Sequence, residues 1–302
     1  MPAPYILHML TPLKHMSPFD VNMALDAGYD AVLPYTQVTD GEVRGLVQDA
    51  MFSRSPDACP RTGIFIAGKN AIQALDMMQA AKESIFPPFE VSIFADPAGS
   101  FTTAAAMVAC VQKTLREKFS RDLNGLRVVV YGATGVVGFC SAVIAAMEGA
   151  KVVLAGHDGE ARVAKSADEI RARFGVETKG ADGSSDEKRA ALAAEADVVL
   201  AAGPAGRQIL SAANLALAKD LIVVSDVNAV PPAGIEGVGV HDDGVPIPGT
   251  KALGIGALAV GNVKYQTESG LFRKMIEAGD AGKVVAFDFR DAYRFAKDFV
   301  GK

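Results

Sequence analysis

A glycine-rich turn placed directly after a short apolar strand constrains this chain more than any other feature. Residues 127–131 read RVVVY, the next seven read GATGVVG, and an apolar stretch of helical length follows. In such a unit the first glycine permits the sharp turn, the second lets backbone amides approach a pyrophosphate, and the third lets the helix pack closely on the strand. The order predicts a Rossmann-type βαβ unit that begins at Arg127. The spacing is GxxGxxG rather than GxGxxG, so glycines that only pack a helix on a sheet are the alternative.

The turn and the end of the next strand supply the first predicted contacts to a dinucleotide cofactor. Free N–H groups and the dipole at the helix start favour an anionic pyrophosphate. The second strand, KVVLAGHD, ends at His157 and Asp158, where an acidic residue can meet the adenosine ribose hydroxyls. Because this strand end lacks an arginine for a 2′-phosphate, we expect NAD or NADP to bind, with NAD preferred. The alternative for Asp158 is a solvated carboxylate that caps the next helix. The predicted contacts in the turn are Gly132, Thr134, Gly135, Val136, Val137 and Gly138.

Two later strand ends should share the carboxyl edge of the same sheet, where ligands bind in open α/β folds. Ala202 and Gly203 follow the strand DVVL, and Asn228 follows LIVVSDV. We predict that Gly203, beside Ala202, lets the backbone pass close to the cofactor and that Asn228 faces the nicotinamide. Ordinary turn chemistry is an equal alternative at these positions.

Length, composition and charge bound the class of protein. At 302 residues with 50% hydrophobic residues, the chain exceeds what one core usually organises, which predicts two domains. A net charge of -5 with mixed signs argues against nucleic acid or an anionic membrane as a partner and favours a small molecule. The uncharged stretch 128–147 is long enough for a membrane span, but its regularly spaced glycines divide it into strand, turn and helix.

Cysteine and histidine usage argues against a metal site and against export. The three cysteines stand far apart without a CxxC pair, and the four histidines form no triad and no metal-ligand spacing. The amino terminus shows neither a basic segment followed by a long apolar stretch nor a small-residue cleavage site. We therefore expect no metal ion, a reducing compartment and a cytoplasmic location.

Strand and helix patterns alternate along most of the chain. The first third alternates apolar strands such as YILHML and GIFIAG with helical segments, and the alternation resumes from RVVVYG to LIVVSDV. This pattern is typical of parallel sheets with helical crossovers. The expected fold is α/β with two domains: a doubly wound, Rossmann-type parallel sheet formed by residues 104–264, and a smaller α/β domain formed by residues 1–103 plus 265–302.

Four segments together resemble one known family. They are FADPAGSFTTAAAMVA (94–109), YGATGVVGF (131–139), DVNAVPPAGIEGVG (226–239) and ALGIGALAVGN (252–262). Across nearly its whole length the chain resembles the bacterial NAD(P)-dependent methylenetetrahydromethanopterin dehydrogenases of one-carbon (formaldehyde) oxidation. The amino-terminal LHMLTPLKHMSPFDVNMA is more similar to the subgroup that accepts NAD as well as NADP than to the strictly NADP-dependent one.

The resemblance implies a domain organisation and a substrate. The smaller domain would bind the pterin, a mobile cleft would separate the domains, and the protein would be a homo-oligomer (a dimer, trimer or hexamer). Ser100, Thr102 and Thr103 of SFTTAAA would contact the pterin, while Ile255 and Gly256 would lie where nicotinamide and pterin meet.

The remaining substrate contacts are basic and acidic residues. The NADP-dependent subgroup carries a substrate-site lysine shortly after ALGIG, whereas this chain reads ALAV there and offers Lys264 as the nearest candidate. The other predicted substrate contacts are Lys14, His15, Asp20 and Lys69.

The implied reaction explains why the chain is poor in catalytic side chains. A hydride leaves a methylene carbon flanked by two nitrogens, and the cation that forms is delocalised over both, so no proton has to move. The protein must align two rings and exclude water. Two alternatives stay open: a methylenetetrahydrofolate or shikimate-type dehydrogenase that uses Lys14 or Lys69 as a catalytic lysine, and a non-catalytic NAD(P)-sensing regulator.

Overall fold

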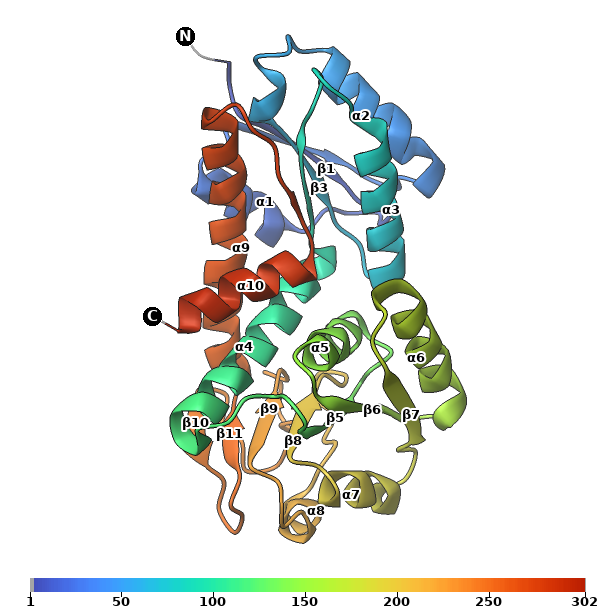
Figure 1. The fold of residues 1–302 in the computed structure, drawn as a ribbon, viewed down its shortest axis with the longest axis vertical. Coiled ribbons are helices and arrows are strands. Elements are labelled where there is room, and N and C mark those ends of the chain that lie inside the picture. The colour runs from blue at the N-terminus through green and yellow to red at the C-terminus, as the bar shows by residue number, and fades with distance from the viewer. Residues whose placement is uncertain (1–2, 302) are drawn as a thin grey trace. The chain divides into compact units, whose positions relative to one another are not determined.

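The computed structural model describes residues 3–301 and has the α/β fold that the sequence predicts. The chain divides into two compact units, each with its own parallel sheet (Figure 1). The first unit contains the residues up to Thr102 together with Tyr265–Phe295, and the second contains Thr103–Lys264 together with the residues from Ala296 onward. The three boundaries fall inside helices α4 (Ser100–Phe119), α9 (Ala257–Asp280) and α10 (Phe289–Val300).

The first unit is built on a sheet with the strand order β12-β4-β3-β1-β2, in which every pairing is parallel. All five residues of β3, TGIFI, are buried, as expected for a central strand that is covered on both faces. The strands are β1 (Ile6–Leu10), β2 (Ala31–Tyr35), β3 (Thr62–Ile66), β4 (Ser92–Ala95) and β12 (Ala286–Phe287). Helices of this unit are α1 (Pro18–Ala27), α2 (Val43–Phe52) and α3 (Ala71–Ser84), with α10 (Phe289–Val300) beginning in it, and short 3-10 turns lie at Asp40–Glu42, Cys59–Arg61 and Pro97–Gly99.

Helix α1 starts where its sequence says a helix should start. Ser17 has an extended backbone, and its hydroxyl accepts a hydrogen bond from the backbone N–H of Asp20, while Pro18 occupies the first helical position. The helix stops at Gly28, whose φ of 116° ends the regular turn. These signals hold the loop between β1 and α1 at the carboxyl end of the sheet.

The second unit has the strand order β10-β11-β9-β8-β5-β6-β7. Read from β7 to β11, this is the 3-2-1-4-5-6 order of a Rossmann sheet, with β5 as its first strand. Only the β10–β11 pairing among its described strands is antiparallel. The strands are β5 (Arg127–Tyr131), β6 (Lys151–Gly156), β7 (Thr178–Asp182), β8 (Val198–Ala201), β9 (Val223–Asp226), β10 (Asp243–Pro246) and β11 (Leu253–Ile255). The helices besides α4 are α5 (Val136–Met147), α6 (Glu160–Phe174), α7 (Asp186–Ala194) and α8 (Ala212–Leu217).

The uncharged stretch 128–147 forms β5, the glycine turn and α5, as predicted. Residues Gly138 to Ala145 are buried without interruption, which explains why the helix needs no polar face. Among residues 3–301, no helix combines the length and the apolar character needed to cross a bilayer.

Candidate functional site

A pocket of about 530 Å³ lies at the carboxyl edge of the second sheet, where β5, β6 and β8 end. This is the switch point of the strand order, because the chain runs from β5 towards β6 on one side and continues with β8 on the other. The pocket wall therefore occupies the position at which doubly wound folds bind dinucleotides. Six predicted cofactor residues line it: Gly132, Thr134, Gly135, His157, Ala202 and Gly203.

The three glycines of the turn have different reasons to be glycine. Gly132 has a φ of +76°, and a Cβ there would lie 2.2 Å from the carbonyl oxygen of Ala202. A Cβ on Gly138 would lie 2.3 Å from the carbonyl oxygen of Gly132. The fold itself therefore requires both residues.

Gly135 is different, because the fold does not exclude a side chain there. Its φ is -81°, it is exposed, and the nearest atom to a Cβ would be Gly132 O at 3.3 Å. It is the N-cap of α5, and the helix begins without a side-chain cap. A bare backbone at a helix start inside a pocket is a cradle for an anion, so these residues fit the pyrophosphate of a dinucleotide.

Titratable side chains follow the end of β6, beside the pocket-lining residues His157 and Thr134. Asp158 Oδ2 lies 3.0 Å from Arg162 Nη1, and Asp158 Oδ1 lies 3.8 Å from His157 Nδ1. Arg162 Nη2 also donates to Thr134 Oγ1 of the glycine turn at 3.4 Å. The Arg162 guanidinium lowers the pKa of Asp158, with a smaller contribution from His157.

The expectation that this strand end lacks an arginine is therefore wrong. Arg162 stands four residues after Asp158, on the first turn of α6, and the helix geometry brings it back to the strand end. Sequence inspection of the strand alone could not find it.

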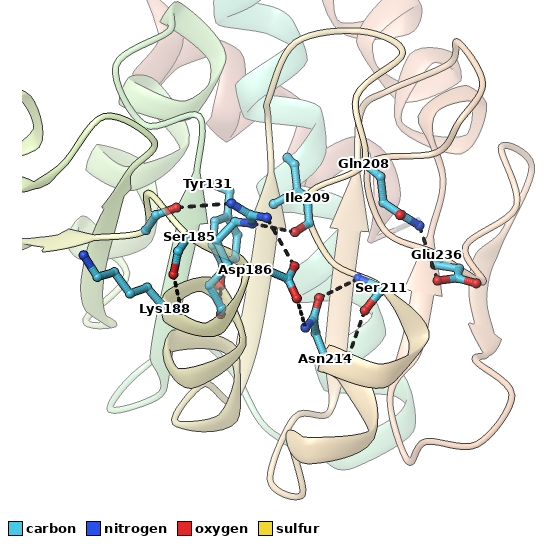
Figure 2. A network of polar contacts seen from close by, with 11 residues as sticks. Tyr131, Ser185, Asp186, Lys188, Gln208, Ile209, Ser211, Asn214 and Glu236 are labelled. Carbon is cyan, nitrogen blue, oxygen red and sulfur yellow. Dashed lines mark hydrogen bonds and ion pairs between the residues drawn. The ribbon is translucent and has the colours of Figure 1, made fainter.

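A polar network holds the opposite wall of the pocket (Figure 2). Tyr131 at the end of β5 donates to the carbonyl oxygen of Arg189 on α7 at 2.7 Å, and Arg189 Nε donates to the carbonyl oxygen of Ile209 at 2.9 Å. Burial raises the pKa of Tyr131, so its hydroxyl remains a donor. Asp186 then links Arg189 to Asn214 at the start of α8. The network fixes the loop after β8, and no motif in the sequence marked it.

The other predicted cofactor residues lie outside the lining of this pocket. Val136 and Val137 are the first residues of α5, directly beside Gly135. Asn228 is occupied by turn contacts, because its Oδ1 accepts from the N–H groups of Gly206 and Val230 and its Nδ2 donates to Pro232 O. Ile255 is fully buried at the end of β11. For Asn228 the structure thus supports the turn alternative over a contact with nicotinamide.

A second pocket, of about 440 Å³, lies in the first unit at the ends of β1 and β3. Lys14 and His15 come from the loop after β1, Asp20 from the first turn of α1, and Lys69 from the loop after β3. Lys14, His15 and Lys69 are exposed, whereas Asp20 is only 2% exposed. The fold thus brings these four predicted substrate residues to one pocket, although more than 50 positions separate the first from the last.

The hydroxyl residues at the start of α4 do not share one environment. Thr102 is fully buried, and its Oγ1 donates to Asp96 Oδ2 at 2.6 Å. The other Asp96 oxygen accepts from the backbone N–H groups of Phe101 and Thr102. Thr102 therefore serves the helix start, while Ser100 and Thr103 are partly exposed. The direct pterin contact predicted for Thr102 has no support in this geometry.

The last two predicted substrate residues lie near the start of α9. A Cβ on Gly256 would lie 2.0 Å from the carbonyl oxygen of Gly239, so this glycine has a packing reason of its own. Lys264 is partly exposed in the first third of the helix and lines neither pocket. Within residues 3–301, no group of three or more His, Cys, Asp or Glu side chains is placed to hold a metal ion.

Comparison with known proteins decides the family. The chain is 57% identical over 296 residues to the NAD(P)-dependent methylenetetrahydromethanopterin dehydrogenase of Methylorubrum extorquens, covering 98% of this chain and 99% of the relative. It belongs to this dehydrogenase family. Residues 18–98 match the family model for the N-terminal part of methylene-tetrahydromethanopterin dehydrogenase.

More distant matches agree in fold. The bifunctional protein MdtA of Methylorubrum extorquens is 34% identical, over 93% of this chain and 94% of its own length. Quinate dehydrogenase from Corynebacterium glutamicum, solved in complex with NAD, superposes with a TM-score of 0.53 at 16% identity, covering 99% of this chain and 100% of that structure. At that identity the likeness concerns the two-unit dehydrogenase fold alone.

Proposed function

We propose that this member of the family oxidises methylenetetrahydromethanopterin, with NAD or NADP as the hydride acceptor. The observation that carries the proposal is the 57% identity over nearly the full length of both chains to a relative named for that activity. The product is the methenyl cation. The bound dinucleotide supplies the oxidising power by accepting the hydride with its two electrons, and no proton is released from the methylene carbon in this step.

The second unit would hold the dinucleotide. The first N–H groups of α5, next to Gly135, would bind the pyrophosphate, and Asp158 would accept hydrogen bonds from the ribose hydroxyls. The predicted preference for NAD should be modest, because Arg162 stands beside Asp158 and offsets the repulsion of a 2′-phosphate. Ala202 and Gly203 would let the cofactor pass over the end of β8.

The first unit would hold the pterin. Its pocket combines the exposed polar side chains of Lys14, His15 and Lys69 with the buried carboxyl group of Asp20, a set of donors and acceptors suited to the polar edge of a heterocycle. Neither lysine needs to transfer a proton in the proposed step, so their role is to position the substrate. Ser100 and Thr103 are further candidates at the start of α4.

The location and assembly of the protein also remain proposals. We infer a homo-oligomer, either a dimer, a trimer or a hexamer, from the family resemblance, and a cytoplasmic location from the three separated cysteines. Cross-linking or light scattering of the purified protein would decide the assembly.

A substrate panel tests the function. Purified protein is offered methylenetetrahydromethanopterin, methylenetetrahydrofolate and shikimate, each with NAD and with NADP, and the absorbance of the reduced nicotinamide is followed. The proposal expects turnover with the methanopterin derivative and far slower or no turnover with the others. Fast oxidation of shikimate or of the folate would contradict it, and dinucleotide binding without turnover of any substrate would favour a regulator.

A further inference from the structure

We propose that Arg162 and Asp158 exchange partners according to the dinucleotide that binds, so that one pair of side chains admits both NAD and NADP. The inference rests on the proposed function of the second unit as a dinucleotide site. With NAD, Asp158 accepts from the ribose hydroxyls. With NADP, Arg162 leaves Asp158 and binds the 2′-phosphate.

The position of the guanidinium carries the inference. Arg162 reaches back from α6 so that Nη1 lies 3.0 Å from Asp158 and Nη2 lies 3.4 Å from the hydroxyl of Thr134. Asp158 follows the end of the second strand of the Rossmann order, and Thr134 belongs to the turn after the first strand. In this fold the adenosine ribose lies between those two elements, so Arg162 spans the place that a 2′-substituent would take.

The pair is also easy to open. The side chains of Arg162 and Asp158 are 56% and 40% exposed, and ion pairs in such surroundings contribute little to stability because water solvates each partner well. The flat guanidinium fork matches the oxygens of a phosphate, which would therefore be a better partner than the single carboxylate oxygen. An NAD ribose, by contrast, competes with Arg162 for the carboxylate.

Three variants test the exchange. Arg162→Ala should lower kcat/KM for NADP by about ten- to a hundredfold, the range expected when one charge-assisted hydrogen bond is lost. It should raise kcat/KM for NAD by about two- to threefold, since a weak competing ion pair disappears. Arg162→Lys keeps the charge but loses the guanidinium fork, so its kcat/KM for NADP should lie between those of the parent and of Arg162→Ala. Asp158→Asn should have the opposite effect: kcat/KM should fall for NAD and rise for NADP.

Arg171→Ala is the matched control. Arg171 lies on the same helix and forms a comparable exposed ion pair with Asp168 at 2.8 Å, but it lies beyond the first turn of α6 that carries Arg162. The NADP to NAD ratio of this variant should equal that of the parent.

Calorimetry with adenosine 2′,5′-bisphosphate and with AMP gives a readout that does not depend on turnover. Arg162→Ala should weaken the bisphosphate by about ten- to a hundredfold and leave AMP bound at least as well as in the parent. If neither nucleotide binds the parent, the proposed dinucleotide site itself is wrong. If both nucleotides bind but Arg162→Ala leaves the ratio of their dissociation constants unchanged, the exchange is refuted while the proposed function stands. The same holds if Arg207→Ala, on the opposite wall, changes that ratio instead.

Discussion

Replacing Gly135 by aspartate should abolish dinucleotide binding without harming the fold. Position 135 is the N-cap of α5 with extended backbone (φ -81°, ψ 163°), a conformation that any residue adopts. A Cβ there would lie 3.3 Å from Gly132 O, which requires a shift of a few tenths of an ångström. Aspartate is among the preferred N-cap residues, so its carboxylate would satisfy the helix N–H groups. The variant should melt within about 2 °C of the parent, because cap exchanges with glycine change stability by only a few tenths of a kcal/mol.

The loss of affinity can be worked from the same geometry. The new carboxylate would stand about 4 Å from a pyrophosphate at the helix start, where like charges repel by roughly 1 kcal/mol in water and about 4 kcal/mol near a protein surface. Capping also removes at least one charge-assisted hydrogen bond from the ligand, about 1.5–3 kcal/mol. Together these effects predict that the dissociation constant for NAD rises by at least about a hundredfold.

Calorimetry with NAD on the folded variant measures this directly, and two further variants separate the causes. Gly135→Asn caps the helix without a charge and should lose clearly less affinity than Gly135→Asp. Gly45→Asp adds a carboxylate to an exposed position of α2 in the first unit, with no atom within 4 Å of its Cβ, and should bind NAD as the parent does. A folded Gly135→Asp protein with unchanged affinity would refute the assignment of the α5 N-terminus as the pyrophosphate site.

Three other predictions concern the substrate pocket, the start of α4 and a buried acid. Lys14→Ala and Lys69→Ala should mainly raise KM for the pterin, since neither transfers a proton; a fall of kcat by several orders of magnitude at unchanged KM would favour a catalytic lysine. Thr102→Val should lower the free energy of unfolding by about 1.5–3 kcal/mol, because it removes a buried hydrogen bond to a carboxylate. Thr102→Ser should keep this hydrogen bond, and urea unfolding measures the free energy of unfolding of both variants. Burial raises the pKa of Asp226 despite the backbone N–H groups of Asn228 and Ile235, so the folded state keeps its proton longer. The stability that Asp226 contributes should decline as pH rises from about 3.9, the ordinary pKa, through the raised pKa. Melting curves of Asp226→Asn recorded over the same pH range should lack this decline.

The glycine turn and the βαβ unit around it could be predicted because local rules govern them. A buried strand, a turn that needs a positive φ at Gly132, and an apolar helix leave one arrangement of the chain, and each signal lies within a dozen residues. The same holds for the loops that bring Lys14 and Lys69 to one pocket, because parallel strands end at a common edge. Their chemical role is a separate question and stays a prediction.

What could not be predicted depends on side-chain partners that only the folded chain supplies. Thr102 looks like a ligand donor in the sequence, but Asp96, six positions earlier, captures its hydroxyl. Asn228 follows a strand end, as a ligand contact would, yet both its amide oxygen and its amide nitrogen bond to the surrounding loop. Arg189 reaches Ile209, twenty positions away, through a loop that carries no sequence signature.

The two halves of the dinucleotide site differ in how freely they can change. A Cβ on Gly132 would meet the carbonyl oxygen of Ala202, and a Cβ on Gly138 that of Gly132, at distances that exclude any side chain. Substitutions at either glycine therefore act on the fold before they act on binding. Asp158 and Arg162 are exposed, and the side chain of Arg162 bonds to Asp158 and to Thr134. Substituting either residue therefore alters the charge beside the pocket and little else. Cofactor choice in this fold can therefore be altered without altering the fold, and the end of β6 with the first turn of α6 is where such a change should be made.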